Sequence, residues 1–164
     1  MAAVHLIVGF MGFGKTTLAK HLEKQLPAVR LTHDEFMAKL YGRNLPEKEF
    51  REKYAIVDNL LWNLVRQVIS CGTDVILDYG FWSKEARLQA LQNTKSISEK
   101  VIFHELICDM QIAKNRVLER SNTDNDALKI DEHCFDLFAK QYEPIQEDEN
   151  LEVIRYRQDW FTKN

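Results

Sequence analysis

Residues 9–16 read Gly-Phe-Met-Gly-Phe-Gly-Lys-Thr, which fits the pattern G-x-x-x-x-G-K-[ST], and they directly follow the apolar run at residues 4–8. A short apolar run that enters a glycine-rich turn is typical of a buried strand followed by a tight loop. In such a loop, glycines let backbone N–H groups point inward at phosphate oxygens, and the helix that follows adds its N-terminal dipole. The sequence therefore predicts a strand, a phosphate-binding loop and a helix in succession.

The loop side chains have separate tasks on a nucleoside triphosphate. We expect Lys15 to neutralise charge on the β- and γ-phosphates and the Thr16 hydroxyl to bind Mg²⁺. A degenerate loop that no longer binds nucleotide is the alternative. The predicted nucleotide-binding residues of the loop are Gly9, Phe10, Met11, Gly12, Phe13, Gly14, Lys15, Thr16 and Thr17.

Length and composition indicate one ordinary globular domain over residues 1–164, with 45% apolar and 29% charged residues. A net charge of −3 gives no general attraction to nucleic acid or anionic lipid. The apolar N-terminal stretch is short and lacks a preceding basic region, so we expect neither a signal peptide nor a membrane span. Cys71, Cys108 and Cys134 are odd in number and far apart, which favours reduced thiols and a cytoplasmic location.

Strand-like and helical patterns alternate along the chain. The expected strands are residues 4–9, 29–32, 74–78, 100–108 and 151–156. The expected helices beyond the loop are residues 46–70, a segment from Ser83 to about 93, and segments 109–120 and 131–142. This order predicts an α/β fold with a five-stranded, parallel, doubly wound sheet that carries helices on both faces. Ligands of such sheets bind at the carboxyl ends of the strands.

Two carboxylates follow expected strand ends. Asp34 comes after the second strand, where it could accept the proton of a substrate hydroxyl. The alternative is that Asp34 only N-caps a helix that starts at Glu35. Asp78 ends the third strand after an apolar run, a pattern that holds Mg²⁺ in phosphate-loop enzymes.

The acceptor of the phosphoryl group would lie beside Asp34. Candidate contacts are Phe36, an aromatic wall at residues 79–82 that includes Phe81, and Arg87, which could bind an anionic group. Each has a structural alternative, because aromatic residues in such a block also fill cores and single arginines also lie on surfaces. His33 could either pack in the loop or contact the acceptor.

Together these residues resemble the small P-loop kinases of the nucleoside-kinase-like group, often labelled AAA-domain kinases. This group is related to zeta toxins, chloramphenicol phosphotransferase and the kinase domain of polynucleotide kinase. The resemblance covers essentially the whole chain and rests on the loop at 9–17, the Asp34 segment, the block at 75–87, Arg116 with Arg120, and the tail at 135–149.

The resemblance implies a P-loop NTPase fold with a small helical lid at roughly 116–130, and Asp34 as the general base. It also implies that Arg116 contacts the nucleotide and that Arg120 acts on the transferred phosphoryl group. The i, i+4 spacing of the two arginines places them on one helical face, although such a face is more often solvated surface.

Departures from related kinases bear on the acceptor. Met37 stands where polynucleotide kinases carry an arginine, and Asp78-Tyr79-Gly80 replaces the glycine triplet of shikimate kinases. The absence of an Asn-Lys-x-Asp run favours adenine over guanine nucleotides. The sequence therefore predicts a kinase that transfers the γ-phosphoryl of Mg·ATP to a hydroxyl of a small molecule. The alternatives are a polynucleotide or toxin-like kinase with a larger acceptor, and a non-catalytic ATP-binding regulatory module.

Overall fold

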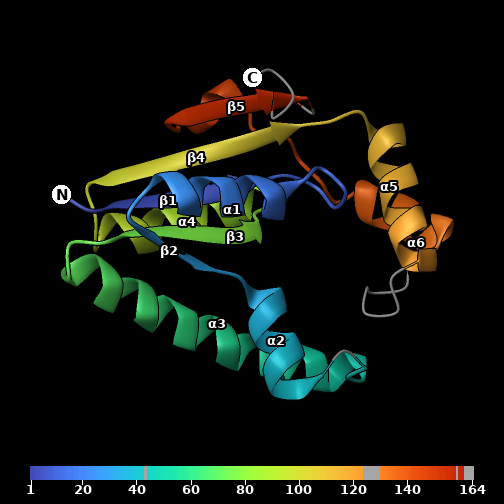
Figure 1. The fold of residues 1–164 in the computed structure, drawn as a ribbon, viewed down its shortest axis with the longest axis horizontal. Helices are drawn as coiled ribbons and strands as arrows, with labels where there is room; N and C mark the ends of the chain where they lie inside the picture. The colour runs from blue at the N-terminus through green and yellow to red at the C-terminus, as the bar shows by residue number, and fades with distance from the viewer. Residues whose placement is uncertain (43, 124–129, 158, 161–164) are drawn as a thin grey trace.

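The computed structural model describes residues 1–42, 44–123, 130–157 and 159–160. The strands are β1 (Ala3–Val8), β2 (Ala28–Leu31), β3 (Asp74–Gly80), β4 (Lys100–Ile107) and β5 (Val153–Arg157). The helices are α1 (Lys15–Gln25), α2 (His33–Tyr41), α3 (Glu47–Ser70), α4 (Lys84–Lys95), α5 (Met110–Thr123) and α6 (Glu132–Ala139), with a short 3₁₀ helix at Glu147–Glu149. Figure 1 shows their arrangement.

The sheet has five strands in the order β2-β3-β1-β4-β5, and every neighbouring pair is parallel. The chain therefore builds the sheet outward from β1 in one direction through β3 and β2 and in the other through β4 and β5. The direction of winding reverses beside β1, and α/β sheets bind ligands at such a switch point. The expected parallel, doubly wound sheet is confirmed, and the fold is that of a P-loop NTPase.

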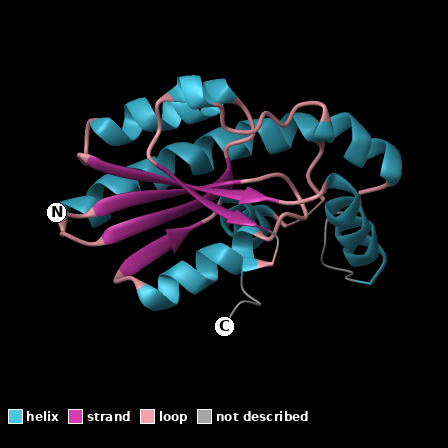
Figure 2. Cartoon of the chain, turned by 90° about the horizontal axis from the view of Figure 1, so that it is seen from above, coloured by secondary structure: helices cyan, strands magenta, loops and turns pink. Residues whose placement is uncertain are grey.

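Helices cover both faces of the sheet and create two cores (Figure 2). Successive residues of a strand point to opposite faces, so the continuous apolar runs of the parallel strands supply both cores. On one face, the strands pack against Val57, Leu61 and Val65 of α3 and Ala90 of α4. On the other face, they pack against Leu18, Ala19 and Leu22 of α1, Ala113 and Val117 of α5, and Phe135 of α6.

The expected strands and helices are confirmed with differences at their ends, and α2, which the sequence raised only in the alternative interpretation of Asp34, is an additional helix. Helix α2 begins at His33 with Thr32 as its N-cap, because Thr32 is extended and its carbonyl accepts the first helical hydrogen bond from the Phe36 N–H (3.4 Å). The interpretation of Asp34 as an N-cap is therefore wrong, and Asp34 lies inside the first turn. Strand β3 extends to Gly80 because it continues to pair with β1 as far as Val8.

Helix α6 ends at Ala139 and not at 142, because Tyr142 turns back onto the aromatic rings of Phe10 and Phe13. The predicted lid, residues 116–130, includes the second half of α5, whereas residues 124–129 lie outside the described part of the chain. Cys71, Cys108 and Cys134 are not paired in disulfides in this structure. Within the described ranges, none of the helices combines the length and apolar character needed to cross a membrane.

Candidate active site

The loop after β1 is shaped by glycines whose conformation other residues rarely adopt. Gly12 and Gly14 have φ angles of +79° and +91°. A Cβ at Gly12 would also lie 2.5 Å from the carbonyl oxygen of Ala113, so the loop packs directly on α5. Helix α1 begins at Lys15 without a side-chain cap, which leaves the N–H groups of its first turn facing the loop. These donors form an anion-binding cradle.

Lys15 lies close to side chains of both charge signs. Its ammonium donates a hydrogen bond to the Phe10 carbonyl oxygen (3.1 Å). Burial lowers the pKa of Lys15, the negative charges of Asp78 and Asp34 oppose that shift, and Arg120 reinforces it. Both predicted carboxylates and one predicted arginine are therefore close enough to Lys15 to act on its charge. A triphosphate bound in the cradle would supply the anionic charge that favours the protonated amine.

Thr16 and Asp78 form the candidate metal site. The Thr16 hydroxyl donates to Oδ2 of Asp78 (2.9 Å), and Asp78 is only 7% exposed. Burial raises the pKa of the Asp78 carboxyl, while the charge of Lys15 and the hydrogen bond from Thr16 counteract the increase. One carboxylate and one hydroxyl suit Mg²⁺, which is usually bound by one or two protein oxygens together with phosphates and waters. The donor set therefore fits the predicted metal.

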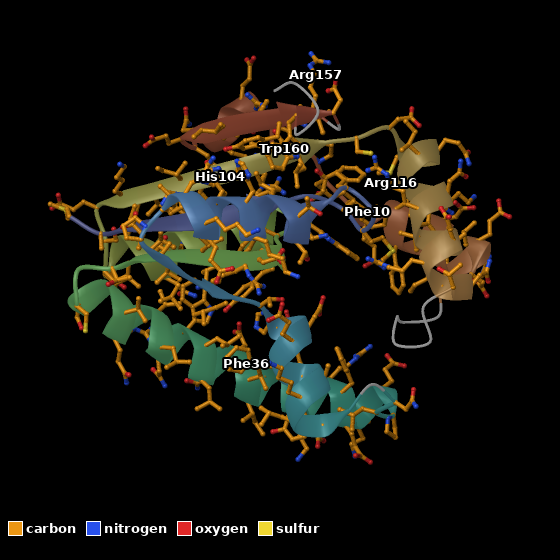
Figure 3. All side chains as sticks on the ribbon, viewed as in Figure 1. Phe10, Phe36, His104, Arg116, Arg157 and Trp160 are labelled. Atoms are coloured by element: carbon orange, nitrogen blue, oxygen red, sulfur yellow. The ribbon has the colours of Figure 1, made fainter. Side chains whose placement is uncertain are left out.

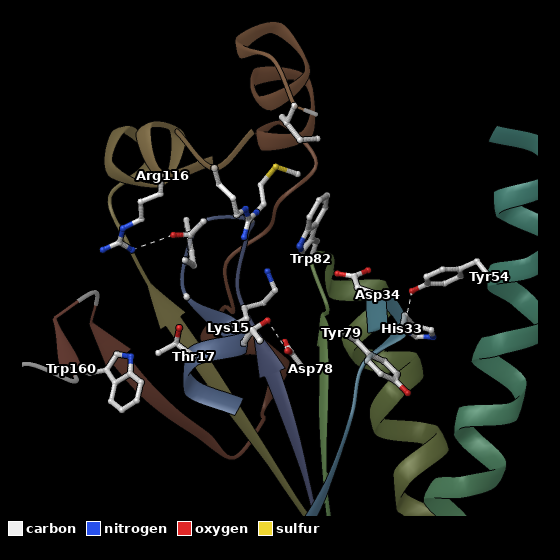
Figure 4. Close-up of a pocket in the computed structure, with 17 residues that line it drawn as sticks. Lys15, Thr17, His33, Asp34, Tyr54, Asp78, Tyr79, Trp82, Arg116 and Trp160 are labelled. Atoms are coloured by element: carbon white, nitrogen blue, oxygen red, sulfur yellow. Dashed lines mark hydrogen bonds between the residues drawn. The ribbon is translucent and has the colours of Figure 1, made fainter. Parts of the chain in front are cut away.

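These groups line a pocket of about 630 Å³ (Figure 4). The predicted site residues in its lining are Met11, Gly12, Phe13, Gly14, Lys15, Thr16, Thr17, Asp34, Asp78, Arg116 and Arg120. Tyr79 and Trp82 of the expected aromatic wall also line the pocket, as does His33, and the remaining lining residues are Tyr54, Ile130 and Trp160. The pocket thus brings together residues from both sides of the sheet's carboxyl edge.

The pocket has two ends, on opposite sides of Lys15 (Figure 4). At one end, Arg116 donates to the Gly12 carbonyl oxygen (3.2 Å). Trp160 lies on the same side of Lys15 (Figure 4), with its ring edge-to-face on His21 of α1 (4.9 Å between centroids). A guanidinium group and an indole ring can both stack on a planar aromatic ring. This end is the better candidate for a nucleotide base.

At the other end, Asp34 lies between Trp82 and Tyr54 (Figure 4). Asp34 is exposed to the pocket, and among the described residues its carboxylate has no hydrogen-bond or ion-pair partner. Burial together with the charges of Asp58 and Asp34 raises the pKa of Tyr54, so this phenol stays protonated at neutral pH. An unpaired carboxylate among aromatic side chains is suited to accept a proton from a bound hydroxyl.

Several predicted site residues do not line the pocket. Gly9 and Phe10 lie beneath the loop, where the Gly9 N–H donates to the Gly80 carbonyl oxygen (3.1 Å) and the Phe10 ring is fully buried. Phe36 and Phe81 pack against the core on the α3 side, and Figure 3 shows Phe36 on α2, away from Phe10. Gly9 and Phe10 therefore shape the loop, and the expected acceptor contacts of Phe36 and Phe81 are corrected to core packing.

The structure contradicts the prediction that Arg87 binds an anionic group of the acceptor. The Arg87 side chain is 0% exposed and makes two 2.7 Å hydrogen bonds to the Glu149 carboxylate. It also donates to the carbonyl oxygens of Phe81 (3.0 Å) and Glu143 (2.8 Å). The guanidinium ties α4 to the loop after β3 and to the C-terminal segment, so it is a structural residue and does not bind an acceptor.

Comparison with known proteins identifies the family and the fold of the chain. A family model described as "AAA domain" matches residues 4–145. The chain belongs to the AAA domain family. No curated protein matches the sequence at a significant level.

Among solved structures, the AAA domain resembles a protein from Chloroflexus aurantiacus j-10-fl that is described as a candidate kinase. The two sequences are 17% identical, and the match covers 99% of this chain and 88% of the other with a TM-score of 0.76. The AAA domain also resembles Chaetomium thermophilum Kti12 in complex with ADP-AlF₃, with 17% identity, coverage of 93% and 89%, and a TM-score of 0.62. A chain of the Pnkp1/Rnl/Hen1 RNA repair complex matches with 16% identity over 88% of this AAA domain, but over only 48% of its own length (TM-score 0.69). These likenesses show a P-loop kinase-like fold, which is a nucleotide-binding fold.

Tyr54 and Trp160 line the pocket of this AAA domain, although no motif in the sequence marks them. Tyr54 sits at a helical spacing that indicates a core stripe on α3, and periodicity does not separate the core from a pocket wall. Trp160 follows the last strand, outside any motif. Its isolated indole beyond a strand end was the available signal, since ligands collect at that edge of the sheet.

Proposed function

We propose that this protein is an ATP-dependent phosphotransferase that moves the γ-phosphoryl group of Mg·ATP to a hydroxyl of a small molecule. The observation that carries the proposal is the position of Asp34, which lies in the same pocket as the phosphate-binding loop and whose carboxylate has no partner within the described ranges. A protein that only bound nucleotide would need the loop, Thr16 and Asp78. It would have no use for a second carboxylate on the far side of Lys15.

In the proposed reaction, the loop amides and Lys15 bind the β- and γ-phosphates and hold the γ-phosphorus in line with the acceptor oxygen. Thr16 and Asp78 would hold Mg²⁺, which would neutralise charge on the phosphates. The acceptor oxygen forms a bond to the γ-phosphorus, the bond to the β,γ-bridging oxygen breaks, and ADP leaves. Asp34 accepts the hydroxyl proton, and Arg120 stabilises the negative charge on the transferring group.

The nucleotide base is assigned to the end of the pocket formed by Arg116 and Trp160, and the acceptor to the end formed by Asp34, Tyr54 and Trp82. A volume of about 630 Å³ lies within the range of small-molecule sites and is shared by both ligands. The aromatic side chains offer flat apolar surface to a compact acceptor. A polynucleotide acceptor is the second candidate, supported by the fold that the chain shares with part of the RNA repair complex.

The test is a metabolite screen for ADP formation from Mg·ATP, in which Asp34→Asn provides the blank for each compound. The proposal predicts that at least one hydroxylated small molecule increases ADP formation with the wild-type protein and not with the variant. Short oligonucleotides with a 5′-hydroxyl are tested as acceptors in the same assay. Activity with oligonucleotides alone would overturn the small-molecule assignment, and equal activity of Asp34→Asn would overturn the role of Asp34.

A further inference from the structure

The imidazole of His33, the residue before Asp34, is held by two side chains of α3. Its Nε2 lies 2.8 Å from Oδ1 of Asp58, and its Nδ1 lies 3.2 Å from the Tyr54 hydroxyl. The ring is stacked on Tyr54, with 4.3 Å between centroids, and contacts the ring of Tyr79 at 3.9 Å. His33 is 4% exposed, so its ring is buried between these side chains. Figure 4 shows Asp34 immediately beside this group.

The Asp34 side chain is not held by contacts like those of His33. Its carboxylate has no hydrogen-bond or ion-pair partner in the described part of the chain, and Thr32, the N-cap of α2, makes no side-chain capping bond. The position of Asp34 therefore depends on the backbone of the first turn of α2. Two residues of that turn are tied to other elements: Glu35 pairs with Arg30 of β2 (2.9 Å), and His33, directly before Asp34, bonds to α3. Tyr54 and Asp58 are spaced i, i+4, so one face of α3 provides both fastening groups.

We propose that Asp58 and Tyr54 are positioning residues for the phosphotransfer reaction, acting through His33 to hold Asp34 against the acceptor. This inference rests on the proposed function, in which Asp34 is the general base. It extends that function to α3, which contributes no residue to the phosphate-binding loop.

The contacts suit this role because they are satisfied in either protonation state of His33. With a neutral ring, the Nε2–H donates to Asp58 and the Tyr54 hydroxyl donates to Nδ1. With a charged ring, both ring nitrogens donate, and the Tyr54 oxygen accepts from Nδ1. Both contacts can therefore form with either form of the ring. The geometry of this anchor matters for rate, since a displacement of about 1 Å in a reacting group can cost about 100-fold in turnover.

The test compares Asp58→Ala, which removes the acceptor of the Nε2–H bond, with Asp58→Asn, which retains an acceptor oxygen. Glu52→Ala is the matched control, because Glu52 is an exposed carboxylate on the same helix. Hydrogen exchange of the full-length protein is followed in peptides that cover α2 (His33–Tyr41) and α1 (Lys15–Gln25). Loss of a hydrogen bond to a charged group should accelerate exchange in α2 about tenfold in Asp58→Ala. Exchange in α1 should not change, and Asp58→Asn and Glu52→Ala should stay within about threefold of wild type.

The second readout is ADP formation from Mg·ATP with water as the acceptor. Asp58→Ala should lower kcat about tenfold or more while leaving the KM for Mg·ATP within about threefold. In an Asp34→Asn background, the same change should have no further effect on kcat, because Asp58 acts only through Asp34. A purely structural role would instead lower both backgrounds equally.

Unchanged exchange in α2 of Asp58→Ala overturns the anchor, and equal losses of kcat in both backgrounds overturn its link to Asp34. Failure of the proposed function is a different result. In that case Asp34→Asn alone leaves ADP formation unchanged, and the exchange of α2 still decides whether Asp58 holds the helix.

Discussion

Glu149→Ala should be one of the most destabilising single changes in this protein. It leaves the Arg87 guanidinium, which is 0% exposed, without the carboxylate that pairs with it through two 2.7 Å bonds. Removal of one partner of a buried ion pair typically costs about 3–5 kcal/mol, because the other charge stays buried. The change also deletes the oxygen that accepts from the Gln146 N–H (2.9 Å). Domains of this kind are stable by about 5–15 kcal/mol, so a large share of the stability is lost.

Urea unfolding followed by circular dichroism measures this loss, with an unchanged m-value as evidence that the unfolding transition is the same. For a chain of this length, we expect the melting temperature to fall by about 6–20 °C. Asp148→Ala is the control, since Asp148 pairs with Lys84 at the surface and its removal should leave the unfolding midpoint unchanged. The loss of unfolding free energy in Glu149→Gln should lie between the losses in Glu149→Ala and Asp148→Ala. A loss below about 1 kcal/mol in Glu149→Ala, or an equal loss in the control, would refute the structural role of Arg87.

Three further predictions address the loop, the sheet and the pocket. Gly12→Ala places a Cβ 2.5 Å from the Ala113 carbonyl oxygen, so calorimetry should show a loss of Mg·ATP affinity of about tenfold or more; wild-type affinity would contradict the tight packing of the loop on α5. Burial lowers the pKa of His104 to about 4, below that of the unfolded chain, so the unfolded state binds this proton first as the pH falls. The free energy of unfolding should therefore decrease from about pH 6.5 to pH 4, by about 3 kcal/mol from this group, and a His104→Gln variant should show a shallower decrease in urea titrations. Trp160→Ala should weaken ADP binding more than it lowers kcat, and an unchanged ADP affinity would remove Trp160 from the base site.

The parts of the fold that are coded locally were predictable. The loop motif requires a strand before it and a helix after it, and the apolar runs of β3 and β4 are long enough to identify strands buried on both faces. Ser83 and Asp131 each precede a helix, and their side chains accept the N–H groups of Ala86 and Cys134 as N-caps do. In these cases a few neighbouring residues determine the structure.

The acceptor side was less predictable because tertiary contacts decide it. Arg87 follows the loop after β3 and could have faced a ligand, but Glu149, distant in sequence, holds it in the interior. Tyr54 has the spacing of a core residue, and only the packing of α2 on α3 brings it to the pocket. Asp34 was assigned correctly to the pocket, although its helix begins earlier than expected, at His33.

The most direct test of the account is a comparison of wild type with Asp34→Asn, using the acceptor that the metabolite screen identifies. We predict that the variant lowers kcat by about 10²–10⁴-fold, the usual contribution of a general base. Its Kd for Mg·ATP, measured by calorimetry, should stay within about threefold of wild type, because the loop, Thr16 and Asp78 are unchanged. Undiminished turnover in the variant, or a loss confined to ATP affinity, would contradict the assignment of this pocket as a kinase site with Asp34 as its base.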